Sequence, residues 1–204
     1  MDYLEFKNKM FDLGCFSSNQ VYAWQPNFDR NNFSHWIKRG LLVRLRQGFY
    51  TFPEYISKPD FSLYFANRIY RPSYVSLHTA LAFYGIIPEA VVQITSVTSL
   101  KTANFNNSFG EYSYKSVSEE LMFGYDLKPL TDGRTLQLAK PEKAILDLLY
   151  LYPFYNTTNE LEELRLDDDF MLDEFNWELM QTYIIQFKNK VLEKRIKLLT
   201  SIYK

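Results

Sequence analysis

The feature of this sequence that most constrains its fold is a change of hydrophobic period at Gly40. Before this glycine, apolar and small residues follow the i, i+3, i+4 and i+7 spacing of a helix, and they are Phe33, Trp36, Ile37 and Gly40. This spacing predicts a helix over residues 28–39, capped by Asn27 or Asp29, with one continuous buried stripe. After Gly40 the period becomes two, which indicates a strand. The chain therefore passes from a packed helix almost directly into a sheet.

The strand after Gly40 is one half of a predicted β-hairpin. Val43 and Leu45 alternate there with Leu42, Arg44 and Arg46. A turn at Gln47 and Gly48 follows, and the segment FYTF, residues 49–52, returns as the second strand. Upstream, an amphipathic helix over residues 3–13 ends at Gly14, and Ser17 or Ser18 caps a second, short helix. Three helices followed by a hairpin are typical of a winged helix-turn-helix, with helix 28–39 as the reading element and the hairpin as the wing.

Charge is segregated along the chain although the formal net charge is only -1. Acidic residues dominate residues 160–178. Positions 30–46 contain no acidic residue, and their charged residues are Arg30, Lys38, Arg39, Arg44 and Arg46. A basic segment of this kind neutralises phosphates, and a helix face with Arg, Asn, Ser or His reads base edges. The predicted DNA-binding residues are Arg30, Asn31, Ser34, His35, Lys38, Arg39, Arg44 and Arg46.

The rest of the chain predicts an α+β protein with three parts. After the winged helix-turn-helix of residues 1–57, the segment 58–155 mixes helical patterns, including one over residues 61–70, with strand-like runs at VVQITSVT, EYSYKSV, LMFGYDL and TLQLA. A further helix starts at Pro141. Residues 156–204 form a helical extension that ends in one long amphipathic helix over about 176–202.

A catalytic or metal site is not expected. Asp126, Glu142 and Lys143 come nearest to a magnesium-dependent nuclease site, but Glu142 and Lys143 are adjacent at a helix start, which is the wrong spacing. Ser76, His78 and Asp147 lie outside any recognisable triad motif, and we interpret His78 as a structural histidine. The single cysteine, Cys15, is interpreted as an inert core residue. We therefore expect no catalytic residue, no metal and no cofactor.

The sequence leaves a second functional hypothesis open. Winged helices also bind proteins, so the chain is alternatively a non-catalytic protein-interaction module that uses its winged helix and its acidic tail. On that hypothesis the acidic segment 160–174 mimics phosphate towards a basic partner, with Phe170, Met171 and Leu172 as anchors. No window approaches the ~20 apolar residues of a membrane span, and the amino terminus lacks the pattern of a secretory signal. We expect a cytoplasmic protein that does not enter a membrane.

Three segments together resemble the AbiEi family, the antitoxin and transcriptional regulator of type IV toxin-antitoxin (abortive infection, phage defence) systems. In WIKRGLLVRLRQGFYTF the resemblance lies in Gly40, Leu41, Arg44, Gly48 and Tyr50. The segment YVSLHTALAFYGIIPE is similar to the opening of the second domain of the family. In LQLAKPEKAILDLLYLYP the matching residues are Ala139, Pro141, Glu142, Lys143, Ala144, Leu146 and Asp147. The likeness covers roughly residues 15–155, and the segment after Pro153 has no matching motif.

The resemblance implies an amino-terminal winged helix that binds double-stranded DNA at its own promoter and represses its operon, joined to an antitoxin-type domain. The expected partner gene encodes a nucleotidyltransferase-like toxin, which such an antitoxin need not contact directly. The resemblance implies no catalytic residues. Because a single winged helix has a small footprint, paired sites or a homodimer are expected for useful specificity.

Overall fold

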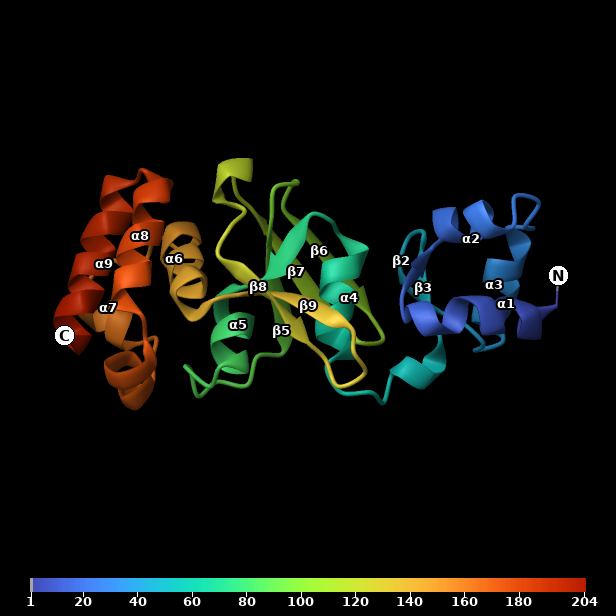
Figure 1. The fold of residues 1–204 in the computed structure, drawn as a ribbon, viewed down its shortest axis with the longest axis horizontal. Helices are drawn as coiled ribbons and strands as arrows, with labels where there is room; N and C mark the ends of the chain where they lie inside the picture. Colours follow the sequence, from blue (N-terminus) through green and yellow to red (C-terminus); the bar gives the residue numbers. More distant parts are fainter. Residues whose placement is uncertain (1) are drawn as a thin grey trace.

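The computed structural model describes residues 2–204, whose helices and strands form three groups along the long axis of the molecule (Figure 1). An N-terminal group lies at one end, a sheet flanked by helices lies in the middle, and the C-terminal helices lie at the other end. The predicted α+β class and the predicted helical C-terminal region are confirmed. One cluster of buried residues runs through all three groups, from Phe6 to Tyr203.

The N-terminal group, here called the N-terminal lobe, combines three helices with a three-stranded sheet. Its helices are α1 (Tyr3–Met10), α2 (Ser18–Trp24) and α3 (Asn31–Lys38), and its strands are β1 (Phe16–Ser17), β2 (Val43–Arg46) and β3 (Phe49–Thr51). The strand order is β1-β3-β2, with both pairings antiparallel. Ser17, one of the two predicted caps, caps α2 in a capping box with Gln20. The two-residue strand β1 was not predicted.

Aromatic side chains fill the core of the N-terminal lobe. Phe6 of α1 lies with its ring centroid 4.5 Å from that of Trp36 on α3. Phe33, also on α3, stacks on Tyr50 of β3 with 4.4 Å between centroids. Aromatic pairs in favourable geometry each add about 0.5–1.5 kcal/mol beyond the burial of area. The high aromatic content of the chain is therefore used here to hold α3 on both α1 and the sheet.

The middle of the molecule is a mixed six-stranded sheet in the order β6-β7-β5-β4-β9-β8. Pairs β4–β9 and β5–β7 are parallel, and the other neighbours are antiparallel. The strands are β4 (Ser73–Val75), β5 (Gln93–Thr98), β6 (Ala103–Asn107), β7 (Gly110–Ser116), β8 (Tyr125–Pro129) and β9 (Thr135–Ala139). Three helices flank this sheet, and they are α4 (Phe61–Ile69), α5 (Leu77–Phe83) and α6 (Pro141–Leu151).

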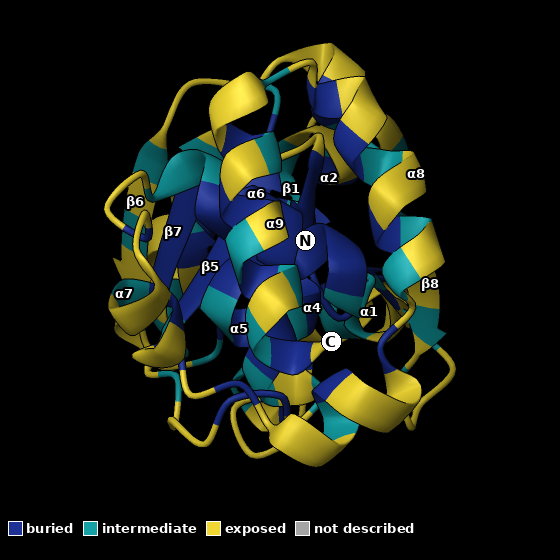
Figure 2. Cartoon of the chain, turned by 90° about the vertical axis from the view of Figure 1, so that its left-hand side faces the viewer, coloured by how far each residue is buried: buried dark blue, intermediate teal, exposed yellow. Residues whose placement is uncertain are grey.

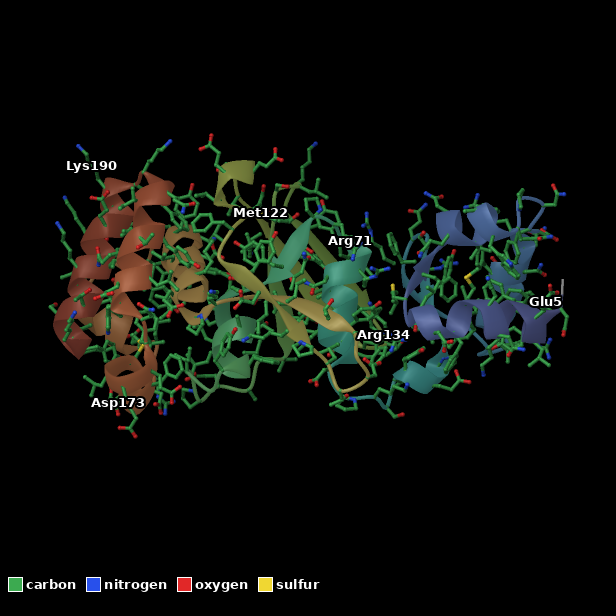
Figure 3. The ribbon with its side chains drawn as sticks, in the orientation of Figure 1. Glu5, Arg71, Met122, Arg134, Asp173 and Lys190 are labelled. Atoms are coloured by element: carbon green, nitrogen blue, oxygen red, sulfur yellow. The ribbon has the colours of Figure 1, made fainter. Side chains whose placement is uncertain are left out.

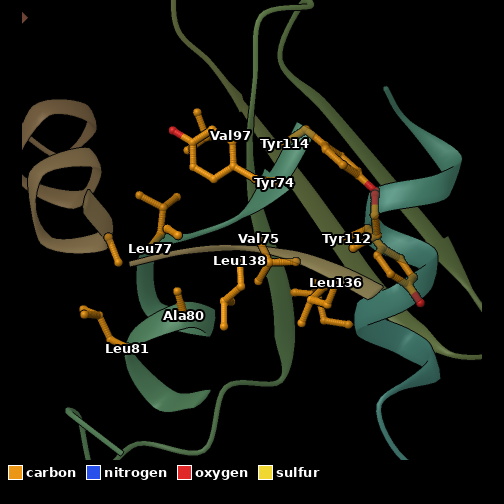
Figure 4. Packing of buried hydrophobic residues seen from close by; sticks show 14 of the residues in the cluster. Tyr74, Val75, Leu77, Ala80, Leu81, Val97, Tyr112, Tyr114, Leu136 and Leu138 are labelled. Atoms are coloured by element: carbon orange, nitrogen blue, oxygen red, sulfur yellow. The ribbon is translucent and has the colours of Figure 1, made fainter. Parts of the chain in front are cut away.

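Helix α4 lies on the side of the sheet towards the N-terminal lobe, and α5 and α6 lie on the other side (Figure 1). Tyr112 and Tyr114 of β7 point towards α4 (Figure 4), and the Tyr114 hydroxyl donates to the Ala66 carbonyl oxygen at 2.8 Å. Leu77 and Ala80 of α5 pack from the opposite direction. Both faces of the sheet are thus covered, which is why its central strands contain long buried runs.

Two strands of this sheet were missed by the sequence reasoning, each for a physical reason. Strand β4 is only three residues long and buried at every position, so it shows no alternation. Strand β6 has the sequence ANFNN and is an edge strand. Asparagine favours turns, so this segment has the composition of a loop.

The C-terminal region consists of helices α7 (Thr158–Glu162), α8 (Trp177–Phe187) and α9 (Lys190–Tyr203), with a π-helical turn at Phe170–Glu174. The single long helix predicted for 176–202 is wrong, because the chain breaks between α8 and α9. Lys188 adopts φ 48° there, and the Asn189 side chain accepts from the backbone N–H groups of Val191 and Leu192. Figure 2 views the molecule from this end and shows exposed residues on the outer turns of α9.

Buried Arg195 attaches α9 to the central part of the molecule. Its guanidinium donates to the carbonyl oxygens of Leu149 at 2.8 Å and Pro153 at 2.9 Å, at the end of α6. Cations suit the carbonyl-rich C-terminus of a helix.

Across residues 2–204, no helix has both the length and the apolar character needed to cross a membrane.

Candidate nucleic-acid interface

Helix α3 is positioned by its buried stripe and by its two ends. At its start, the Asp29 carboxylate accepts from the Asn31 backbone N–H at 2.9 Å, so Asp29 rather than Asn27 supplies the cap. Phe33 and Trp36 are buried, as predicted. Gly40 was predicted on this stripe but is exposed. It adopts φ 68° instead and ends the helix, a conformation that favours glycine.

The opposite face of α3 is entirely exposed. The predicted site residues that it carries are Arg30, Asn31, Ser34, His35, Lys38 and Arg39, and each of them is exposed. Within residues 2–204, none of the cations among them forms an ion pair. The sequence prediction of one apolar and one hydrogen-bonding face is therefore matched by the burial of the side chains. An unpaired cation in water keeps its full capacity to bind an external anion.

Arg44 and Arg46, the two arginines of the β2–β3 hairpin, lie on either side of an irregularity in strand pairing. The register shifts between Arg44 and Arg46, because Arg44 pairs with Tyr50 and Arg46 pairs with the adjacent Phe49. The bulge lies at Leu45, which is buried, while Arg44 before it is exposed. The two arginines therefore meet different surroundings, although the sequence places them two residues apart on the same strand.

Arg46 is bound by the central part of the molecule. Its guanidinium donates to the Ile69 carbonyl oxygen at 2.6 Å, beyond the end of the hairpin. It also lies 4.9 Å from the ring centroid of Tyr70 and 4.6 Å from that of Phe105, which is cation–π distance. The sequence reasoning treated Arg44 and Arg46 as equivalent DNA contacts, whereas in the structure Arg44 is free and Arg46 holds the hairpin against β6 and α4.

Other contacts fix the same junction. The Asn107 side chain donates to the Leu45 carbonyl oxygen at 3.0 Å, and the Tyr64 hydroxyl donates to the Leu13 carbonyl oxygen at 3.1 Å. The β2–β3 hairpin is thus not a free arm, because it packs on the central sheet through its bulged strand β2. Its exposed residue Arg44 has a defined position relative to α3.

A cavity of about 520 Å³ joins α2, α3 and the hairpin. Arg30 at the start of α3 and Arg44 on the hairpin both line it, together with the Ser18 and Gln47 side chains. No carboxylate lines this cavity. The arrangement places two guanidinium groups around one concave surface, which is a geometry suited to a phosphate or a base edge.

The sequence reasoning missed three further arginines near this surface. Arg68 and Arg71 belong to the end of α4 and the segment after it, and Arg134 precedes β9. They line a cavity of about 320 Å³, and Figure 3 shows Arg71 and Arg134 at the end of the central sheet that faces the N-terminal lobe. The available signal was the pair of arginines around Tyr70 without an acidic neighbour, but nothing in the sequence places them beside the hairpin.

The residues considered for catalysis serve other contacts. Buried Asp147 pairs with Lys143, and it accepts from the hydroxyls of Tyr74 at 2.9 Å and Ser76 at 2.8 Å. Burial raises the pKa of Asp147 and lowers the pKa of Lys143, and their pairing opposes both shifts. This network lies under α6 with no exposed surface on either charged side chain, so it stabilises the packing of α6 on β4.

The remaining candidates each make a separate contact. Asp126 lies 3.7 Å from the Lys140 ammonium group, and Glu142 accepts from the Asn176 backbone N–H at 3.1 Å. Within residues 2–204, no group of three or more His, Cys, Asp or Glu side chains converges as metal ligands would. His78 is half-buried beside the Tyr152 ring, and burial lowers its pKa. Cys15 is buried, which raises the pKa of its thiol to about 12.

Two comparisons with known proteins complete the description of this surface. A search of protein-family models and a search of curated proteins both found no match to the chain. The exposed cations, the cavity that Arg30 and Arg44 line, and the three sequence motifs are therefore the features that indicate a function.

Proposed function

We propose that this protein is a sequence-specific DNA-binding transcriptional regulator whose N-terminal lobe is a winged helix-turn-helix. The order of its elements supports this proposal, since α1, β1, α2 and α3 precede the β2–β3 hairpin, and β1 completes the small sheet. In winged helices the third helix enters the major groove and the hairpin contacts the flanking backbone. Helix α3 is the reading element on this proposal.

The single observation that carries the proposal is that the cations on α3 and at Arg44 of the hairpin are exposed and form no ion pair within residues 2–204. Arg30, Lys38, Arg39 and Arg44 are exposed, and none of them is neutralised by a carboxylate among the described residues. The opposite side of the same helix is packed in an aromatic core. A surface with this construction neutralises phosphates, and each neutralised phosphate steepens the salt dependence of binding by about 0.9.

The residues divide into two roles. Asn31, Ser34 and His35 lie in the first turns of α3 and present donors and acceptors to base edges. Lys38 and Arg44 bind the phosphate backbone and set the register of the helix. Arg46 acts through the protein, because it holds the hairpin that carries Arg44. We expect paired half-sites bound by two copies of the chain, since one such module buries a small area.

The experiment is fluorescence anisotropy with a labelled fragment from upstream of its own gene, unrelated competitor DNA, and a salt series. The wild type is expected to resist competitor and to weaken linearly with the logarithm of salt concentration. The Lys38→Ala/Arg44→Ala variant removes two phosphate contacts, so its slope is expected to be shallower by about 1.8. A matched control, Lys194→Ala/Lys197→Ala, removes two exposed cations of α9 and is expected to bind like the wild type.

Binding of the wild type that does not exceed binding to competitor would reject a sequence-specific regulator. Stable co-purification of a protein partner would then support the interaction-module alternative. Equal slopes for Lys38→Ala/Arg44→Ala and the wild type would instead show that DNA binds elsewhere on the molecule.

We further propose that the regulator is the autorepressing antitoxin of a type IV toxin-antitoxin system. This part rests on the three AbiEi-like segments, two of which lie in the central sheet region rather than in α3 and the hairpin. The expected target is a nucleotidyltransferase-like toxin encoded by a neighbouring gene. Expression of that gene alone should arrest growth, and its co-expression with this chain should restore growth. Arrest that persists in the presence of the chain would reject the antitoxin role.

A further inference from the structure

A row of cavities continues from the hairpin towards the central sheet. Arg44, which lines the cavity beside α3, also lines a second cavity of about 790 Å³. Arg46 and Asn104 of β6 take part in this second cavity, so it crosses from the N-terminal lobe to the edge of the central sheet. No carboxylate lines it. The basic surface is therefore not confined to the N-terminal lobe.

The row extends over the end of α4. Arg46 also lines a third cavity, where Arg68 and Arg71 join it. Those two arginines line a fourth cavity as well, which also contains Arg134. Neither cavity has a carboxylate among its lining residues. Each cavity thus shares at least one arginine with the next, from Arg30 at one end to Arg134 at the other.

Arg68 and Arg71 are the two free cations at the far end of this row. Neither forms an ion pair in residues 2–204. Arg71 donates through Nε to the Asn67 carbonyl oxygen at 3.0 Å, which fixes the root of the guanidinium. Partial burial of its guanidinium lowers the pKa of Arg71, and the charge of Arg68 adds to this shift. Two like charges side by side without a counterion favour the binding of an anion.

Arg134 differs from its neighbours because it is already engaged. It pairs with Asp132, and it donates to the Asp12 carbonyl oxygen at 2.5 Å and to the Tyr55 hydroxyl at 3.2 Å. It therefore ties the central sheet to the N-terminal lobe, as Arg46 does at the hairpin. These two ties hold Arg68 and Arg71 in a defined position relative to α3.

We propose that Arg68 and Arg71 bind phosphates of the same DNA duplex that α3 reads, so that the interface extends from the N-terminal lobe across the hairpin onto α4. The inference rests on the proposed function and adds a second contact region to it. Duplex DNA is the occupant that fits, because the arginines shared between the cavities form a continuous row, no carboxylate of residues 2–204 lines these cavities, and the row starts at the proposed reading helix. A duplex offers regularly spaced phosphates along such a row.

The test compares duplexes of two lengths. The short duplex carries one half-site of about one helical turn, ~10 bp, and two longer duplexes extend it by about one further turn of unrelated sequence at either end. For the wild type, extension at one end should tighten binding and steepen the salt slope by about 1.8, as expected for two further phosphate contacts. The Arg68→Gln/Arg71→Gln variant should bind the short duplex like the wild type and lose this gain.

The outcomes separate the two proposals. If the wild type binds the short duplex and the variant keeps the full gain on extension, the second contact region is rejected and the proposed function stands. If the wild type binds none of the duplexes with preference over competitor, the proposed function fails and this inference fails with it. Thermal unfolding checks that the variant is folded, and Arg71→Gln alone, at an exposed position, should lose about half of the change in slope.

Discussion

Lys38 and Lys143 are the same side chain on two helices, and the molecule gives them opposite surroundings. Lys38 is exposed on α3 and forms no ion pair among residues 2–204. Lys143 is fully buried on α6, pairs with Asp147, and donates to the Tyr74 hydroxyl at 2.8 Å. A cation that is neutralised inside the protein supports the fold, whereas a cation left in water is available to a ligand.

The two surroundings have different energetic consequences. Burying a lysine and an aspartate removes both from water, and their attraction together with the hydrogen bonds offsets that penalty. Removal of one partner leaves the other buried and uncompensated. Removal of an exposed cation such as Lys38 changes the fold little, because water already solvates it. Stability and DNA affinity should therefore respond to different lysines and arginines.

The largest effect is expected for Lys143→Met, which leaves the Asp147 carboxylate buried without its cation. We expect a loss of about 3–5 kcal/mol in the free energy of unfolding, measured by urea unfolding with circular dichroism. The control is Lys143→Met/Asp147→Asn, in which the neutral amide still accepts from the Tyr74 and Ser76 hydroxyls and recovers much of the loss. A single variant as stable as the wild type would contradict the structural role of the pair.

An intermediate effect is expected for Arg46→Ala, at the junction between the hairpin and the central sheet. This variant loses the hydrogen bond to Ile69 and the contacts with the Tyr70 and Phe105 rings. We expect a loss of about 2 kcal/mol in the free energy of unfolding. Arg44→Ala, two residues away, is the matched control and should stay within about 0.5 kcal/mol of the wild type. Equal losses of unfolding free energy in the two variants would show that Arg46 does not hold the hairpin on the central sheet.

A charge reversal on α3 should change binding without changing stability. Lys38→Glu is expected to stay within about 0.5 kcal/mol of the wild type in urea unfolding. Its affinity for the upstream DNA fragment should fall by about tenfold or more at ~0.1 M salt, because one phosphate contact is lost and a repulsion is added. Anisotropy and unfolding measured on the same preparation separate the two outcomes. A variant that unfolds easily would place Lys38 with the structural cations.

The smallest effect is expected at His78, which is half-buried and forms no ion pair among residues 2–204. Burial lowers its pKa in the folded state below its ordinary value of 6.5, with Glu89 acting weakly in the opposite direction. Above pH 6.5 the imidazole is neutral in both states and its contribution to stability is fully present. As the pH falls towards the folded pKa, the unfolded chain takes up the proton more readily, so stability is lost.

Comparison of the wild type with His78→Gln at about pH 7.5 and pH 5.5 measures this contribution. The wild type should lose more stability than the variant over that interval, since glutamine does not titrate. An identical loss in both proteins would show that the surroundings of His78 do not disfavour its charged form.

The sequence predicted those parts of the site that depend on neighbouring residues. The helical spacing of Phe33 and Trp36 predicted which side of α3 is buried, and therefore which residues are exposed. The serines at positions 17 and 18 predicted the start of α2, where Ser17 is the cap, and the turn at Gly48 predicted the hairpin. The break at Lys188 was missed because it contains neither glycine nor proline, although Asn189 carried the signal of a helix cap.

The sequence by itself determined the α+β class, the amphipathic character of α3 and the segregation of basic from acidic residues, because these follow from local period and from charge order. Only the tertiary structure decided which of the individual charged side chains are bound within the protein and which stay exposed. The bulge at Leu45 and the approach of β6 and α4 turned Arg46 into a tie and left Arg44 free. The same packing placed Arg68 and Arg71 beside the hairpin. Their neighbours are distant in the chain, so no local pattern encodes them.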